Sequence, residues 1–112
     1  MERHQQLGRL EKHLEQLIAM LSLDPLCNWG RHFESCLATT RELLAHGFTQ
    51  QQLNELSGST MCVYGGAGSF NDYAPVTRIG SGGALELISG MEDVDTLAGK
   101  VYQSALALRV VG

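Results

Sequence analysis

Leucine and isoleucine recur through the first twenty residues at the spacing of one helix face. The apolar positions are Leu7, Leu10, Leu14, Leu17, Ile18 and Leu21. Steps of three and four residues match the turn of an α-helix, so these side chains form one stripe. The opposite, solvent-facing side then carries Glu11, Lys12, Glu15 and Gln16. Such a stripe must be buried against other elements, so the chain is expected to build a helical core.

A second helix is predicted to begin at Asp24-Pro25, because an N-cap residue followed by proline is a typical helix start. Gly47 is placed to end it. The apolar stripe of this helix comprises Trp29, Phe33, Cys36 or Leu37, and Leu43 or Leu44.

A short third helix is predicted after Thr49, because Thr49 and Gln52 match a capping box. It should bury Leu53 and Leu56 and end at Gly58. A last helix carries three acidic residues in its first turn, Glu92, Asp93 and Asp95, where they favour the helix dipole. Its apolar face comprises Val94, Leu97, Ala98, Val101, Tyr102, Ala105 and Leu108.

The chain between the third and the last helix has a different composition. Nine of the 13 glycines lie between Gly58 and Gly99. Met61–Tyr64 is either the last turn of a helix or a brief strand. Val76–Ile79 is a possible strand ended by glycines, and Ala84–Ile88 is too short for its periodicity to decide between helix and strand.

A glycine-rich loop, residues 63–73, is the most distinctive segment of the chain. Glycine reaches positive φ without steric cost, so three glycines within four positions indicate a tight loop, and the aromatic flanks should pin it to a core. A phosphate-binding loop is a weaker interpretation, because no lysine follows and Asn71 stands where a dinucleotide fingerprint has its third glycine. The loop motif comprises Tyr64, Gly65, Gly66, Gly68, Ser69, Phe70, Asn71 and Asp72.

Together these segments predict a mostly α-helical fold for residues 1–112. It would be a small single-domain bundle with a minor short β element. A glycine-rich loop, Gly65–Asp72, would cross one end of the bundle. The first, second and last helices should pack around Leu14, Leu17, Trp29, Phe33, Leu97 and Val101.

Composition excludes several function classes. The net charge is −4 with only eight Lys and Arg, and the sequence has no basic cluster, so nucleic-acid binding is not expected. No apolar run is long enough to span a membrane, and no signal-peptide segment is present, so a cytoplasmic protein is expected. The odd set of Cys27, Cys36 and Cys62 indicates reduced thiols, two or three of them buried.

Few residues suggest chemistry. His32 and Cys36 are four residues apart on one helix, with His13 and Cys27 as possible companions in a zinc site, but a core cysteine and a surface histidine are the simpler interpretation. Cys62 would be a nucleophile only if a histidine approached it. No catalytic residue, cofactor or metal site is therefore predicted.

Asn71 and Asp72 are expected first to hydrogen-bond the loop's own amides or a helix end. A polar anchor for a partner is the alternative interpretation of this pair.

The chain resembles a family of small, uncharacterised bacterial proteins. The resemblance lies in Trp29, the loop motif and the closing helix. The family pattern is a second helix opening with tryptophan, then Tyr-Gly-Gly-x-Gly-Ser-Phe-Asn-Asp, then a closing helix; here it covers most of the chain from about Leu14. The chain departs from it at Ala67, where a larger apolar residue is common, and at Tyr73-Ala74-Pro75, where aliphatics usually follow. The resemblance implies a fold, and some proteins of this style are similar to immunity proteins that neutralise a bacterial toxin domain.

The leading hypothesis is therefore a non-enzymatic immunity protein that binds a cognate toxin, as a monomer or homodimer. Its acidic balance suits a basic toxin surface. The candidate partner contacts are Asp72, Tyr73, Glu92, Asp93 and Asp95. The alternatives are a small enzyme or ligand-binding protein that uses the glycine-rich loop, and a helical module that self-associates.

Overall fold

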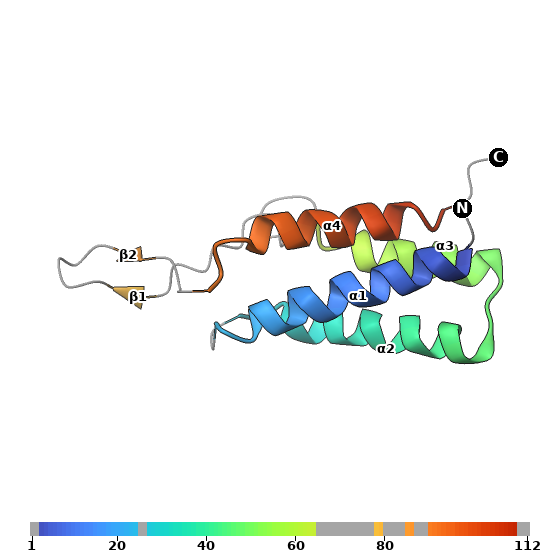
Figure 1. The fold of residues 1–112 in the computed structure, drawn as a ribbon, viewed down its shortest axis with the longest axis horizontal. Helices are drawn as coiled ribbons and strands as arrows, with labels where there is room; N and C mark the ends of the chain where they lie inside the picture. The colour runs from blue at the N-terminus through green and yellow to red at the C-terminus, as the bar shows by residue number, and fades with distance from the viewer. Residues whose placement is uncertain (1–2, 25–26, 65–77, 80–84, 87–89, 110–112) are drawn as a thin grey trace.

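The fold is mostly α-helical, as the sequence predicts (Figure 1). A computed structural model describes residues 3–24, 27–64, 78–79, 85–86 and 90–109. The elements in chain order are α1 (Arg3–Leu21), α2 (Gly30–His46), α3 (Gln50–Met61), β1 (Arg78–Ile79), β2 (Leu85–Glu86) and α4 (Val94–Leu106).

The four helices form one bundle in which α1 packs against α2 and α4, and α3 packs against the same two helices. Helix α1 runs antiparallel to both of its neighbours (Figure 1). One end of the α1–α4 pair is joined by the Arg3 guanidinium, which donates to the Ala107 carbonyl at 3.0 Å. The bundle therefore has four seams between neighbouring helices, among them one along α2 and α3 and one along α1 and α4.

The leucine stripe of α1 forms the centre of the core. Leu7, Leu10, Leu14, Leu17 and Leu21 are all buried, and Ile18 is half-buried beside them. Opposite them lie Phe33 and Val101, which are also buried, while Trp29 and Leu97 are half-buried at the margin. The predicted core is therefore confirmed, with those last two residues at its edge.

The predicted start of the second helix is wrong, because α2 begins at Gly30 with Trp29 as its N-cap. Asp24 is buried, and its backbone carbonyl accepts a hydrogen bond from the Cys27 amide at 3.1 Å. The chain must reverse between antiparallel α1 and α2, and this reversal outweighs the local preference for a helix start at Asp24. The predicted end is confirmed: Gly47 has φ +92° and donates its amide to the Leu43 carbonyl.

The start of α3 is confirmed by a complete capping box between Thr49 and Gln52, with distances of 2.8 and 3.2 Å. The predicted end at Gly58 is wrong, because the helix continues to Met61. The residues on either side of Gly58 are held in the helix by burial, since Ser57 and Thr60 are both inaccessible. Met61 is thus the last helical residue, and a turn follows it up to Tyr64. Of the two structures predicted for Met61–Tyr64, the end of a helix is therefore confirmed over the brief strand.

The minor β element is an antiparallel pair in which Arg78 lies opposite Glu86 and Ile79 opposite Leu85. The described part of Ala84–Ile88 is therefore a strand. The pair lies beyond the end of the helices in Figure 1. The predicted crossing of Gly65–Asp72 over the bundle lies outside the described residues.

Helix α4 presents the predicted apolar face, with Val94, Val101 and Ala105 buried; Leu108 is buried too, although it lies beyond the last helical residue. Over the described residues, none of the helices combines the length and hydropathy needed to cross a membrane.

Candidate functional site

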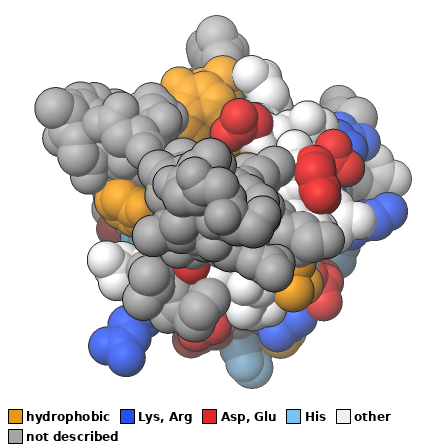
Figure 2. All heavy atoms as spheres, turned by 90° about the vertical axis from the view of Figure 1, so that its left-hand side faces the viewer, with side chains coloured by type: hydrophobic (Ala, Val, Ile, Leu, Met, Phe, Trp, Pro, Cys, Tyr) orange, Lys and Arg blue, Asp and Glu red, His pale blue; other side chains and the backbone are white. Residues whose placement is uncertain are grey.

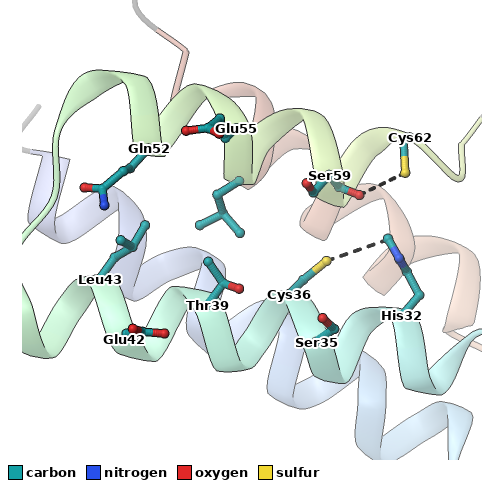
Figure 3. A pocket seen from close by; sticks show the side chains of 11 residues that line it. His32, Ser35, Cys36, Thr39, Glu42, Leu43, Gln52, Glu55, Ser59 and Cys62 are labelled. Carbon is teal, nitrogen blue, oxygen red and sulfur yellow. Dashed lines mark hydrogen bonds between the residues drawn. The ribbon is translucent and has the colours of Figure 1, made fainter.

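A groove with a volume of about 530 Å³ runs along the seam between α2 and α3. Each helix contributes one stripe of side chains that recur at intervals of three and four residues, so each stripe lies on one helix face (Figure 3). The stripe from α2 comprises His32, Ser35, Cys36, Thr39, Glu42 and Leu43, and the stripe from α3 comprises Gln52, Glu55, Leu56 and Ser59, followed by Cys62 just after the helix.

The floor of the groove is apolar and its rim is polar. Cys36, Leu43 and Leu56 are buried, whereas the rim hydroxyls, amide and carboxylates are exposed. Glu42 and Glu55 stand on opposite helices (Figure 3), and the lining contains no lysine or arginine among the described residues. The groove therefore has an apolar base between two negatively charged walls.

At one end of the groove, the Cys36 thiol lies 3.7 Å from Nε2 of His32. Burial raises the pKa of the Cys36 thiol, and nearby Cys62 raises it further, while a hydrogen bond with the Thr60 side chain works the other way. The thiol form of Cys36 is thus favoured over the thiolate, which is the nucleophilic form. His32 in turn packs edge-on against the ring of Phe33, with centroids 5.1 Å apart.

The second thiol of the groove, Cys62, is exposed and donates to the Ser59 carbonyl at 3.1 Å. All three cysteines are free thiols, but only Cys36 is buried, and Cys27 is half-buried. The prediction that two or three of them are buried is therefore wrong. Cys62 lies outside the core because it follows the last residue of α3, where the chain turns away from the helix.

The four residues considered for zinc do not form one cluster. His13 hydrogen-bonds Ser104 at 2.6 Å on the α1–α4 seam, and the Cys27 sulfur accepts the Trp29 amide at 3.4 Å. Within the described ranges, no group of three or more histidine, cysteine, aspartate or glutamate residues is arranged to hold a metal ion. His32 and Cys36 do meet, as their spacing predicts.

Tyr64 is the one residue of the glycine-rich loop motif that the structure describes. Its hydroxyl donates to the Ala98 carbonyl at 2.8 Å, and its ring meets those of Phe33 and Tyr102 edge-on. Burial raises the pKa of Tyr64, and nearby Cys36 adds to the rise. Tyr64 therefore joins the end of α3 to α2 and α4, in agreement with its predicted role as an anchor.

The rest of that motif, with the predicted partner contact Tyr73, lies outside the described residues. These positions are Gly65, Gly66, Gly68, Ser69, Phe70, Asn71, Asp72 and Tyr73.

The three acidic residues predicted as partner contacts at the start of the last helix are all exposed. Asp95 lies in the first turn of α4 and Asp93 is its N-cap, without a side-chain capping bond. Glu92 precedes the helix and accepts the Gly90 amide at 3.2 Å. They are not among the residues that line the groove. Figure 2 looks onto the end of the molecule from which the hairpin projects, and its described hydrophobic side chains form separate small patches.

The groove itself was not predicted, although the sequence holds a signal for it. Polar residues follow the same three- and four-residue spacing on both helices, directly beside each apolar stripe. That pattern is also typical of an ordinary solvated helix face, and only the packing of α2 beside α3 distinguishes the two.

Comparison with known proteins places the groove within a shared domain. Searches of curated proteins and of solved structures returned no match. Residues 23–81, more than half of the chain, match the model of a family described as a domain of unknown function, DUF6966. This span contains α2, α3 and β1 completely, so both walls of the groove lie inside it. The chain belongs to the DUF6966 family.

Proposed function

We propose that this protein is a non-enzymatic binding protein whose α2–α3 groove receives a basic segment of a partner protein. The charge of the groove carries the proposal: Glu42 and Glu55 line it from opposite helices, and no described lysine or arginine lines it. A lysine or arginine side chain can lay its aliphatic stem on the apolar floor and its charge between the two carboxylates. The location of both walls within the family span further supports this groove as the shared binding site.

The partner that suits these properties best is a toxin domain encoded beside the gene, which would make the protein an immunity protein. A net charge of −4 favours rapid association with a basic surface. The resemblance to small bacterial immunity proteins also favours a toxin domain as the partner. In this proposal the protein acts in the cytoplasm, without a cofactor, a metal or nucleic acid.

A monomer is proposed over a self-associating module because the exposed large hydrophobic residues do not form one patch. Among the described residues they are Leu23 and Leu106. Leu23 follows the end of α1, whereas Leu106 lies near the start of α1, where Arg3 bonds Ala107. A 19-residue helix separates the two by about 28 Å.

Co-expression with the product of the neighbouring gene tests this function. The wild-type protein should co-purify with the toxin domain and restore growth to cells that produce it. Charge reversal at both walls, Glu42→Lys with Glu55→Lys, should weaken the complex at least about 100-fold, because like charges would then face the basic segment.

The matched control is Glu34→Lys, which reverses an exposed glutamate of α2 that does not line the groove. It should bind like the wild type. Loss of binding in both variants would show that overall charge, and not the groove, attracts the partner. Growth that the wild-type protein fails to restore would reject the immunity function itself.

A small enzyme or ligand-binding protein is the second candidate, because the groove contains two thiols and a histidine. His32 contacts Cys36, but burial favours the thiol form of Cys36 over the nucleophilic thiolate. This candidate is therefore placed second. Retained binding and protection in a Cys36→Ala, Cys62→Ala double variant would favour the binding function. Loss of both in a folded double variant would favour thiol chemistry.

A further inference from the structure

The seam between α1 and α4 contains a second cavity, with a volume of about 400 Å³. Helix α1 lines it with Gln6, Arg9 and His13, and α4 lines it with residues that include Gly99, Lys100 and Ser104. None of the residues around this cavity is acidic within the described ranges. In a chain of net charge −4, this is a local concentration of positive charge.

Among the described residues, no carboxylate forms an ion pair with the cations that line this cavity. The ion pairs found among the described residues are those of Arg41 with Glu11 and Glu15, so neither Arg9 nor Lys100 has an acidic partner there. The sequence predicts no basic cluster because Arg9 and Lys100 are far apart along the chain. The antiparallel packing of α1 and α4 brings them to one cavity.

His13 lines the same cavity. Its Nδ1 lies 2.6 Å from the hydroxyl of Ser104, which is only 6% exposed, so the ring is held in one orientation. Burial lowers the pKa of His13, and the positive charges of Lys100, Lys12 and Arg9 lower it further, while a backbone hydrogen bond with Lys100 works against them. The neutral form of the ring is thus favoured, so the positive charge of the cavity comes from Arg9 and Lys100.

Most of the surface that lines the cavity is apolar. Gly99 and Ala107 are among the lining residues, and the side chains of Arg9 and Lys100 have aliphatic stems that can add to this surface. A Cβ added at Gly99 would meet no atom within 4 Å. Glycine inside an exposed helix is less favourable than alanine, and no neighbour among the described residues requires it at this position.

We propose that this cavity binds a small organic carboxylate with an apolar body. The carboxylate would lie between Arg9 and Lys100, and the hydrocarbon part would lie over Gly99 and Ala107. An inorganic anion would leave the apolar part uncovered, and a neutral hydrocarbon would leave the cations unpaired. This binding does not depend on the function proposed for the α2–α3 groove, since the two sites share no lining residue.

Titration of the full chain with three probes tests the proposal. Octanoate presents both a charge and an apolar body, acetate presents the charge, and octanol presents the apolar body. By calorimetry and by the NMR shifts of α1 and α4 amides, octanoate should bind at least about tenfold more tightly than either of the other probes. Equal affinities for octanoate and octanol, or for octanoate and acetate, would overturn the proposal.

Two matched pairs of variants locate the site. Gly99→Leu should fill the cavity and abolish octanoate binding, whereas Gly8→Leu should not, because Gly8 also lies in a helix with open space around its Cβ but does not line the cavity. Lys100→Gln should weaken binding about tenfold, whereas Lys12→Gln, which removes a charge outside the lining, should change it less than twofold.

Circular dichroism confirms that each variant is folded. Binding that survives Gly99→Leu, or that is lost equally in Gly8→Leu, would mean nonspecific uptake of octanoate and would overturn the proposal. Glu42→Lys with Glu55→Lys should leave octanoate binding intact.

Discussion

The α2–α3 and α1–α4 seams of this bundle are built alike and differ in the charge that they collect. Each is formed by two helices and holds an open hollow of several hundred cubic ångströms. The α2–α3 groove carries Glu42 and Glu55, whereas the α1–α4 cavity carries Arg9 and Lys100. Two hollows of similar size on one small helical scaffold therefore carry charges of opposite sign.

The seams also differ in how they relate to the family. The α2–α3 groove lies entirely within residues 23–81, whereas all of α1 and all of α4 lie outside that span. The groove is therefore the candidate for a function common to the family. The α1–α4 cavity is the candidate for a property of this particular chain.

Removal of the ring of Phe33 should have the largest effect. Phe33 is fully buried and supports the α2–α3 groove through edge contacts with His32 and Tyr64. Phe33→Ala should lower the free energy of unfolding by about 3–5 kcal/mol, because it leaves a cavity in the core. Urea denaturation measures the loss.

The control for Phe33→Ala is Leu106→Ala, at a residue that is 41% exposed. It should cost within about 0.5 kcal/mol. A loss below about 1 kcal/mol for Phe33→Ala would show that the groove does not depend on the core beneath it.

The thiols of the groove should react at very different rates. Cys62 is exposed, whereas Cys36 is 4% exposed and burial raises the pKa of its thiol. Iodoacetamide should modify Cys62 roughly 100-fold faster than Cys36, a difference of about 2.7 kcal/mol in activation free energy. Peptide mapping by mass spectrometry gives both rates. Similar rates would show that the floor of the groove opens readily.

Removal of the Tyr64 hydroxyl should have an intermediate effect. Tyr64→Phe loses the hydrogen bond to the Ala98 carbonyl and leaves that carbonyl without this donor, so stability at pH 8 should fall by about 1 kcal/mol. Tyr102→Phe, which does not alter this bond, serves as the control.

The same residue predicts an alkaline dependence of stability. Because burial raises the pKa of Tyr64 above its ordinary value of 10, the unfolded chain loses this proton first as the pH rises. The wild-type protein should therefore lose stability above about pH 10, and Tyr64→Phe should lack this component. Denaturation curves that fall equally in both proteins would contradict the buried environment of this hydroxyl.

The smallest expected effect is on the loss of stability as the pH falls into the acid range. The pKa of His13 is lowered from its ordinary value of 6.5 by burial and by Lys100, Lys12 and Arg9, so the unfolded chain binds a proton more readily than the native state does. The contribution of His13 to stability is therefore complete above pH 6.5 and is lost as the pH falls below it. His13→Gln should flatten that decline, whereas His46→Gln, at an exposed position, should leave it unchanged.

The sequence predicts the helices well where one local signal is decisive. The leucine spacing of α1, the Thr49 capping box and the Gly47 end are all confirmed. The Asp24-Pro25 start and the Gly58 end are wrong, since burial and the path of the chain outweigh the local preference at both places.

Neither seam could be predicted from the sequence. The two walls of each cavity come from different helices, and periodicity within one helix does not show which other helix lies beside it. Within the groove, only the interaction of His32 with Cys36 could be predicted from the sequence, because both residues lie on α2.

The hydrogen bond from Tyr64 to Ala98 fixes the point at which the chain leaves the bundle, and buried Met91, bonded to the Val94 amide, fixes the point at which it returns. Tyr64 bonds to α4 and Met91 bonds to the first residue of α4, so the chain leaves and rejoins the bundle at the same helix. The entropy of joining two fixed points through a chain segment grows only logarithmically with its length, and doubling the length costs about 0.6 kcal/mol. A change in the number of residues between Tyr64 and Met91 should therefore have little effect on the free energy of unfolding of the four helices.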